Sequence, residues 1–379
     1  MMVVLWVVPF RALAQWIDDP VVEQKLQRGI NNIYSIEFEK ADSQFTAVIQ
    51  MRPDHPVGYF FRAMTVWWQI LTDFDNESRD EKFYGMLEQV VTMCEDRLDK
   101  DPKDVAALFF KGGAVGFRGR LRVNRGKYVG AANDGLVALP VVRKAFELDP
   151  QNYDVLLGIG IYNYYAEVVP EKYTIVKPFM IFFPSGDRKK GLEQLVLASQ
   201  NAKYARVEAS YFLLQSYFVY EKDFSKSLAI ARDLNKRFPQ NPVFHRFLGR
   251  CYISLGHLGE ANDVFLEIER RFKKKQTGYD SYDGREAYYY LGKYEFLTGK
   301  IDLSLRHLYA CDSLSRIVDK GEPSGFMSLT NLMIGMIYDM QNKRDYAVQQ
   351  YQKVLQLKEY ENSQRDARLF LQQPYKRKP

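Results

Sequence analysis

The chain has 379 residues, of which 46% are hydrophobic, 15% aromatic and 26% charged; this composition can fill a large core and excludes wholesale disorder, a collagen-like chain and a coiled coil. The net charge of +6, from 53 Lys plus Arg against 47 Asp plus Glu, is small for this length and gives no reason to expect a dedicated nucleic-acid-binding protein. Length alone allows two or three domains of about 150 residues each.

Residues 1–14, MMVVLWVVPFRALA, combine an apolar run with the small-x-small pattern Ala12-Leu13-Ala14 that suits signal peptidase. We therefore expect a signal peptide, a soluble mature chain that begins at Gln15, and export to the periplasm or cell envelope. However, no Lys or Arg precedes the apolar run, and Arg11 follows it. Two explanations stay open: a start assigned too far downstream, or a buried first helix that only mimics a signal, which would leave the chain in the cytoplasm.

Small residues recur along the rest of the chain inside apolar helical patterns. They are Gly29, Ala63, Gly112, Gly160, Gly249, Gly292 and Gly335. An isolated Gly in a helix interior costs about 1 kcal/mol relative to Ala, so its repeated use predicts that a second helix packs closely at each of these positions.

About twelve residues after several of these positions comes a second small residue, and a large apolar residue follows four positions later. In the first unit these residues are Gly29, Ala41 and Phe45, with Pro53 near the end of the unit. Later units give the sets Gly249, Tyr252, Ala261 and Phe265; Gly292, Ser304 and Leu308; and Gly335, Tyr338, Ala347 and Tyr351.

This pattern resembles the tetratricopeptide repeat, a helix-turn-helix unit of about 34 residues with small residues at its eighth and twentieth positions and Pro near its end. Gly29 and Ala63 are 34 residues apart, as are Gln215 and Gly249. The resemblance implies an all-α fold, an α-solenoid of about eight hairpins in a right-handed superhelix, in an exported member of bacterial type. Residues 15–362 would form the solenoid without an internal domain boundary, and residues 363–379 a C-terminal capping helix with a basic tail.

Two insertions, residues 116–130 and 164–188, interrupt the repeat, and long loops on a regular scaffold often carry specificity. The first belongs to a basic segment with no acidic residue between Val105 and Asn133. Its candidate anion-binding residues are Arg118, Arg120, Arg122, Arg125 and Lys127. They predict a site for an acidic protein, a phosphate or an anionic lipid headgroup. The alternative is a solvated helix end and loop whose charges are balanced by acidic neighbours in space.

The second insertion contains an apolar stretch, residues 175–183, in a region where three prolines prevent one long helix. We expect an extended or briefly helical hook that lies against the solenoid. The hook could plug the concave surface, grip a partner or touch a membrane; the alternative is that it fills a gap between neighbouring hairpins. Ser185 or Asp187 is expected to cap the helix that follows.

Aromatic residues cluster in three helical segments, and adjacent residues of a helix face different ways. Some members of each cluster must therefore point away from their own hairpin, either to the next repeat or to the concave surface, where aromatic anchors supply binding energy. The candidate partner-binding residues are Trp67, Trp68, Tyr162, Tyr165, Tyr288 and Tyr289. Core packing is the alternative for each of them.

The sequence contains no recognisable catalytic or metal-binding motif. The four histidines lack metal-ligand spacing, there is no nucleophile elbow or phosphate-binding loop, and Cys94, Cys251 and Cys311 lack CxxC spacing and are expected to be buried free thiols. We expect a non-enzymatic scaffold that binds a protein or peptide on its concave surface, with no cofactor, metal, nucleic acid or small-molecule substrate. The alternative is a membrane-peripheral adaptor that binds anionic lipid through the basic insertion and residues 175–183.

Overall fold

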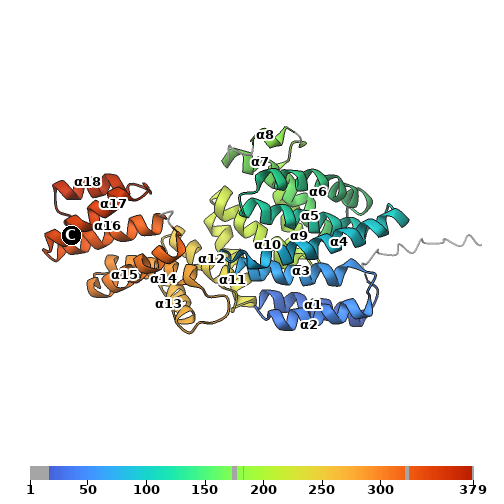
Figure 1. Ribbon diagram of the computed structural model, residues 1–379, viewed down its shortest axis with the longest axis horizontal. Helices are drawn as coiled ribbons and strands as arrows, with labels where there is room; N and C mark the ends of the chain where they lie inside the picture. The colour runs from blue at the N-terminus through green and yellow to red at the C-terminus, as the bar shows by residue number, and fades with distance from the viewer. Residues whose placement is uncertain (1–16, 173–176, 182, 321–323, 378–379) are drawn as a thin grey trace, which may run out of the picture. The chain divides into compact units, whose positions relative to one another are not determined.

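The computed structural model describes residues 17–172, 177–181, 183–320 and 324–377, so the predicted signal peptide lies outside the described residues. Within these ranges the regular elements are helices, and consecutive helices pack against each other (Figure 1). The predicted all-α solenoid fold is confirmed. The described chain divides into two compact units, which we call unit 1 (residues 17–70 and 76–213) and unit 2 (residues 71–75 and 214–377).

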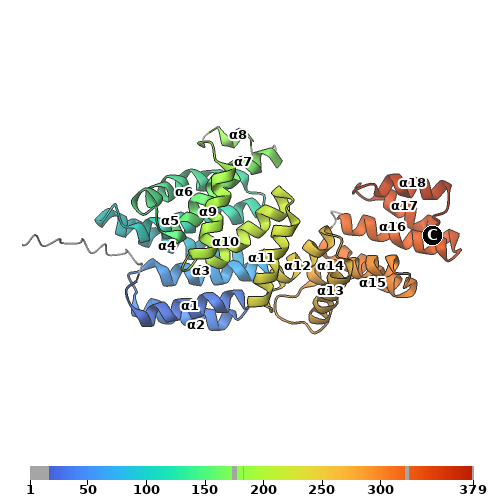
Figure 2. The ribbon, with the colours of Figure 1, turned by 180° about the vertical axis from the view of Figure 1, so that it is seen from behind.

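Unit 1 contains the first helices of the chain, seen from both sides in Figures 1 and 2. They are α1 (Pro20–Tyr34), α2 (Phe38–Met51), α3 (Pro56–Leu71, without its last residue), α4 (Asp80–Lys100), α5 (Val105–Asn124), α6 (Tyr128–Leu148), α7 (Tyr153–Lys172), the short α8 (Lys177–Met180), α9 (Arg188–Asn201) and most of α10 (Arg206–Gln215). Hairpins form where α1 packs on α2, α5 on α6 and α7 on α9.

Unit 2 continues from the end of α10 through a π-helical segment, Ser216–Glu221. Its helices are α11 (Phe224–Arg237), α12 (Pro242–Ser254), α13 (Leu258–Lys273), α14 (Ser281–Leu297), α15 (Ile301–Val318), α16 (Gly325–Met340), α17 (Arg344–Gln356) and α18 (Ser363–Gln372). The hairpins are α12 with α13, α14 with α15, and α16 with α17, and α18 packs on the last of them. One uninterrupted solenoid over residues 15–362 stays a prediction, because each unit is described by itself.

Short polar residues determine where several helices begin. Asp19 precedes Pro20 and accepts hydrogen bonds from the first backbone N–H groups of α1, and Asn241 does the same before α12. Asp187 accepts from the backbone N–H of Lys190 and caps α9, as one of the two sequence-based alternatives predicts. These side chains satisfy N–H groups that have no partner within the helix.

Glycines at the eighth position of the repeat lie where the two helices of a hairpin meet. A Cβ atom on Gly29 would lie 2.5 Å from the Phe45 ring, and one on Gly249 would lie 2.7 Å from the Phe265 ring. The same arrangement pairs Gly292 with Leu308 and Gly335 with Tyr351. In all four pairs the large residue follows the glycine by sixteen positions. This spacing in the sequence therefore indicates a close approach between the two helices of a hairpin.

The two insertions take different forms. Residues 116–130 mostly lengthen α5 and α6, each of about twenty residues, and only the short turn at 125–127 separates the two helices. In the second insertion α7 continues through Pro170 to Lys172, and α8 is the brief helix expected of the hook. Residues 173–176 and 182 lie outside the described part of the chain. The three cysteines are buried and unpaired, as predicted.

Candidate functional site

The basic segment runs from α5 into the turn before α6, and buried carboxylates face it. Asp134 of α6, whose side chain is only 3% exposed, accepts from Arg118 Nε at 2.9 Å and from Arg122 Nη1 at 2.6 Å. Glu88 of α4 accepts from Arg118 Nη1 at 2.6 Å. Two of the predicted anion-binding arginines therefore share one buried carboxylate of their own chain.

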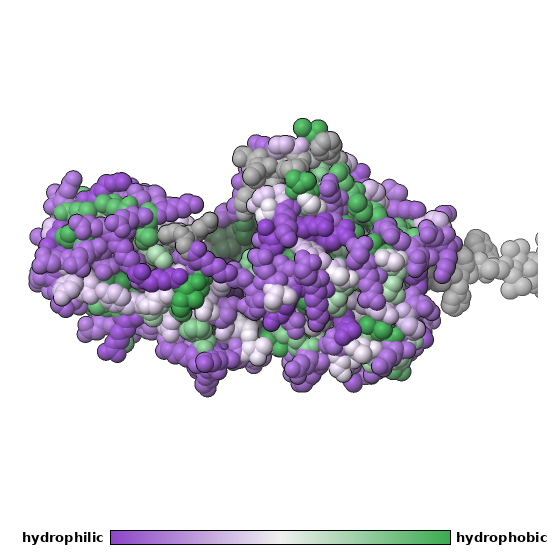
Figure 3. Space-filling model, viewed as in Figure 1, coloured by the Kyte–Doolittle hydropathy of each residue, from purple (hydrophilic) through white to green (hydrophobic). Residues whose placement is uncertain are grey.

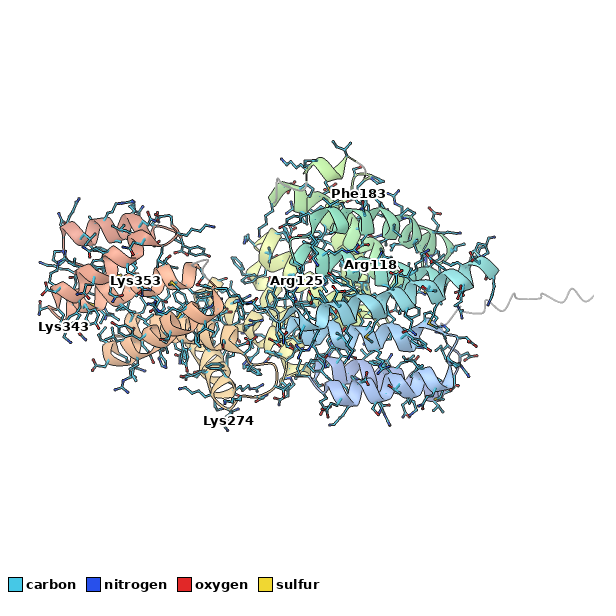
Figure 4. All side chains as sticks on the ribbon, in the orientation of Figure 1. Arg118, Arg125, Phe183, Lys274, Lys343 and Lys353 are labelled. Atoms are coloured by element: carbon cyan, nitrogen blue, oxygen red, sulfur yellow. The ribbon has the colours of Figure 1, made fainter. Side chains whose placement is uncertain are left out.

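Arg125, at the end of the same segment, is the most enclosed of these cations (Figure 4). Its side chain is 5% exposed and that of Asp80 is 7% exposed. The guanidinium donates two hydrogen bonds to the carboxylate, Nε to Oδ2 at 2.7 Å and Nη2 to Oδ1 at 3.0 Å. The hydrogen bonds that Arg125 donates to Asp80 raise the pKa of Arg125. Lys127 differs from these arginines, because its side chain is exposed and its Nζ lies 5.9 Å from the Tyr84 ring.

Arg120 joins the two sets of residues that the sequence singled out. Its guanidinium carbon lies 4.2 Å from the centre of the Phe212 ring and 5.2 Å from that of Trp67, and Nη1 donates to Glu208 Oε1 at 3.4 Å. A guanidinium over aromatic faces is attracted by their negative quadrupole. We call Trp67, Trp68, Arg120, Glu208 and Phe212 the Arg120 cluster.

Glu208 supplies the negative charge of the Arg120 cluster. Its Oε2 accepts from Trp68 Nε1 at 3.3 Å and from the Tyr34 hydroxyl at 3.4 Å. Burial raises the pKa of this carboxyl, and the positive charge of Arg120 opposes that rise. Trp67 and Trp68 are themselves buried, so in unit 1 they pack in the core; partner binding by these two residues stays a prediction.

Tyr162 and Tyr165 lie half-buried on α7. The Tyr162 hydroxyl donates to the carbonyl oxygen of Pro184, and the Arg143 guanidinium carbon lies 5.7 Å from the centre of its ring. Tyr165 packs edge-on against Phe212, with ring centres 5.9 Å apart, and so adjoins the Arg120 cluster. Both tyrosines keep part of their surface exposed.

Tyr288 and Tyr289 are buried on α14 in unit 2. Tyr288 stacks on His307 with ring centres 5.7 Å apart, and Tyr289 packs edge-on against Phe326 at 5.1 Å. The structure therefore separates the six aromatic candidates into two half-buried residues and four core residues. Lys293, one turn further along α14, is exposed.

Three ion pairs of unit 2 link a first helix to a residue about one repeat further along the chain; two of them join α12 to α14, and the third joins α14 to the end of α15. Arg250 of α12 donates two hydrogen bonds, of 2.6 and 2.5 Å, to the carboxylate of Glu286 on α14. The other pairs with about one repeat between their members are Arg246 with Asp283 at 3.2 Å and Arg285 with Asp319 at 2.5 Å. The members of each pair are 34 to 37 residues apart in the sequence, close to the length of one repeat.

Two groups at this interface have strongly displaced pKa values. Burial, helped by the nearby Asp280 carboxylate and opposed by Arg246, raises the pKa of Asp283 to about 7. Burial and the charge of Arg271 lower the pKa of His245 to about 4, and its Nδ1 lies 3.0 Å from the Tyr279 hydroxyl. At neutral pH His245 is therefore uncharged, while the Asp283 carboxyl holds its proton more tightly than an ordinary aspartate.

The acidic partners were missed by sequence reasoning. The stretch without acidic residues ends at Asn133, one residue before Asp134, while Asp80 and Glu208 are 45 and 88 residues from the arginines that they bind. Ion pairs between residues three or four positions apart on one helix can be read from the sequence, but these longer separations cannot. In unit 2 the signal is present, because charges of opposite sign recur at the repeat spacing.

Within the described ranges, no group of three or more His, Cys, Asp or Glu side chains is arranged to hold a metal ion. No helix in these same ranges is both long and apolar enough to cross a bilayer.

No protein-family model and no curated protein matches the sequence. Solved structures do match the fold. One is a chain in the crystal structure of the APC/C hetero-tetramer Cut9–Hcn1, with a TM-score of 0.51 and 12% identity over 88% of this chain and 52% of that chain. Others are yeast Tom70, with a TM-score of 0.38 and 10% identity over 90% and 86% of the two chains, and the human IFIT1 dimer with PPP-AAAA, with 0.45 and 13% over 88% and 72%. This chain spans about half the length of the Cut9–Hcn1 chain. At this level of identity the likeness shows the fold alone, a solenoid similar to that of tetratricopeptide-repeat proteins.

Proposed function

We propose that this chain is a non-enzymatic scaffold that binds a protein or peptide on the first helices of its hairpins. The observation that carries the proposal is the regular packing of hairpins, which presents equivalent positions of successive helices side by side. Repeat folds of this kind use such extended surfaces for binding. In unit 1 the half-buried Tyr162 and Tyr165 supply aromatic side chains on the first helix α7, and in unit 2 the exposed Lys293 supplies a positive charge on the first helix α14.

A crosslinking capture with matched variants tests this proposal. Tyr162 and Tyr165 would be changed together to Ala, because both keep part of their side chain exposed, whereas changes at the buried Trp67 or Trp68 would damage the core. We expect the double variant to keep its melting temperature within a few degrees and to lose a partner that the parent chain captures from its own envelope fraction. The control is Leu266→Ala on the second helix α13, at an exposed position. Equal capture by both variants would refute a role for the two tyrosines, and no capture by the parent chain would refute the scaffold.

We also propose that the scaffold acts after export, on the strength of the apolar run and the cleavage pattern in residues 1–14. N-terminal sequencing of the fractionated protein tests this point. A mature start at Gln15 in the envelope fraction supports export, and an intact N-terminus in the cytoplasmic fraction refutes it.

A membrane-peripheral role is the second candidate function, and one observation favours it. Ile181, just after α8, is 82% exposed, and α6 exposes Val129, Leu136 and Val137. The nearby Phe183 packs against Gly135 of α6, where an added Cβ would lie 2.9 Å from the ring, so the two apolar regions adjoin (Figures 3 and 4). Contiguous exposed apolar residues mark interaction sites.

Liposome flotation tests this second candidate. Ile181→Asp should abolish binding to vesicles that contain anionic lipid, while Ile317→Asp, at a 66% exposed position of α15, should not. Substitution of Arg118, Arg122 or Arg125 would be a poor test, because these side chains hold buried carboxylates. Binding that is equal for both Asp variants, or no binding by the parent chain, would exclude membrane contact through this edge.

A further inference from the structure

The segment that follows α18 lies across the ends of two first helices of unit 2. Residues 374–377 have no regular secondary structure, yet they contact α14 and α16. The backbone N–H of Tyr375 donates to Asp339 Oδ2 at 2.8 Å, near the end of α16. The Arg377 Nη2 donates to the carbonyl oxygen of Leu297 at 2.7 Å, at the end of α14.

The Tyr375 side chain is the apolar anchor of this segment. Its ring centre lies 5.2 Å from that of Phe370 and 6.2 Å from that of Phe296, and it packs against the core that α14, α15 and α16 share. We call the surface formed by Phe296, Leu297, Asp339 and Phe370 the Tyr375 site. An aromatic ring that enters such a surface contributes much of the energy of a peptide contact.

The walls of the Tyr375 site are also held by contacts that do not involve residues 374–377. Asp339 also accepts from the Tyr351 hydroxyl at 2.8 Å and from Arg344 Nη1 at 2.9 Å. Arg344 in turn donates to the carbonyl oxygens of Phe370 and Leu371 at 2.8 and 2.7 Å, which holds α18 in place. Removal of residues 374–377 therefore leaves the carboxylate paired and the aromatic walls supported.

The charge of the Tyr375 site matches that of its occupant. The Asp339 carboxylate is balanced by Arg344, but the carbonyl groups at the end of α14 carry the negative end of the helix dipole. The segment supplies positive charge in return, with Lys376 and Arg377 next to Tyr375. One backbone hydrogen bond, one aromatic anchor and one Arg contact are interactions that a segment of another chain can reproduce.

We propose that the Tyr375 site binds an extended partner segment with an aromatic residue followed two positions later by Arg, and that residues 374–377 occupy this site in cis. The inference rests on the proposed scaffold function and specifies the chemistry of one partner. A tethered segment competes at a high effective concentration, so the full chain binds such a partner more weakly than a chain from which the segment is removed.

A peptide titration tests the proposal. The probe is a fluorescein-labelled peptide QQPYKRKP, identical to residues 372–379, and binding is read by fluorescence anisotropy. A chain that ends at Gln373 should bind it saturably, with at least tenfold higher affinity than the full chain. A peptide with Ala at the position of Tyr375, and a scrambled peptide of the same charge, should bind at least tenfold more weakly than the parent peptide.

Two further variants keep the result decisive. If the shortened chain does not fold by circular dichroism, the full chain with Tyr375→Ala and Arg377→Ala replaces it, because these changes weaken the segment and leave the backbone intact. Phe296→Ala in the binding-competent chain should reduce affinity, while Leu369→Ala, at an exposed position of α18, should not. Equal binding of the scrambled peptide, or no gain on release of the segment, overturns the proposal. These in vitro outcomes are independent of whether the chain captures a partner from the envelope fraction.

Discussion

Units 1 and 2 hold their charges in different ways. In unit 1 the arginines of one basic segment bind Asp80, Asp134 and Glu208, which come from three other helices at unrelated distances along the sequence. In unit 2 Arg246 and Arg250 bind residues about one repeat further on. Where the helices keep the length of the repeat, ion pairs repeat with it; where α5 and α6 are lengthened, the pairs are specific to one place.

This difference separates structural charge from charge that is free to bind a partner. A dense run of arginines is the most conspicuous charged feature of the sequence, yet the structure gives Arg118, Arg122 and Arg125 buried carboxylate partners. Anion binding by the basic segment stays a prediction.

The largest effect is expected at the enclosed pair of unit 1. Asp80→Ala would remove the carboxylate that the buried Arg125 guanidinium binds by two hydrogen bonds, and loss of one partner of a buried pair costs about 3–5 kcal/mol in the free energy of unfolding. Urea denaturation measures this cost. Lys40→Ala, in an exposed pair with Glu37, is the control and should cost at most about 1 kcal/mol. Similar costs at both sites would show that the basic segment is not held by its acidic neighbours.

The second effect concerns the glycines that the repeat predicted. Gly249→Ala should destabilise unit 2 by about 1–3 kcal/mol, because its Cβ would enter the buried Phe265 ring. The same change at Gly85, exposed on α4 with no atom within 4 Å of its added Cβ, should stabilise the chain by up to about 1 kcal/mol. Thermal denaturation measures both changes, a lower melting temperature for Gly249→Ala and an equal or higher one for Gly85→Ala. A stabilising change at Gly249 would refute the close helix approach.

The third effect is a pH dependence in unit 2. The pKa of Asp283 is raised to about 7 from an ordinary value of 3.8, so its contribution to stability is present below about pH 4 and is lost as the pH rises toward 7. The pKa of His245 is lowered to about 4, so its contribution is present above about pH 6.5 and is lost as the pH falls toward 4. The two contributions oppose each other in the same window.

Variants separate these two contributions. In Asp283→Asn the free energy of unfolding should rise between pH 4 and pH 7, because only the His245 contribution remains. In His245→Gln it should fall over the same range. Each change in the free energy of unfolding should be on the order of 1 kcal/mol or more. Denaturant titrations at fixed pH values measure both slopes. Parallel curves for the parent chain and Asp283→Asn would contradict the raised pKa of Asp283.

The smallest effect is expected at Lys127, the exposed cation of the basic segment. Lys127→Glu should change the free energy of unfolding by at most about 0.5 kcal/mol, because its side chain lies in solvent. Calorimetry of phosphate binding to the parent chain and to this variant then tests the anion prediction without damage to the fold. A loss of stability as large as that of Asp80→Ala would place Lys127 in the structural network instead.

The sequence predicts the fold better than it predicts the binding residues. Gly29 and Phe45 lie in one hairpin, sixteen residues apart, and such a local packing rule leaves a period that can be read without coordinates. Trp67 is a candidate for partner binding and Arg120 a candidate for anion binding. Their contact depends on how α3, α5 and α10 pack together. Residues 374–377 fold back onto α14 and α16 to occupy the Tyr375 site, and the repeat period in the sequence does not predict this contact.

Site-specific photocrosslinking tests the scaffold proposal most directly. A photoreactive residue would replace Lys293, exposed on the first helix α14, or Ile317, exposed on the second helix α15 of the same hairpin. In the producing cell, the proposal predicts a discrete crosslinked protein from position 293 and none from position 317. Crosslinks of equal intensity and identity from both positions, or none from either, would contradict it.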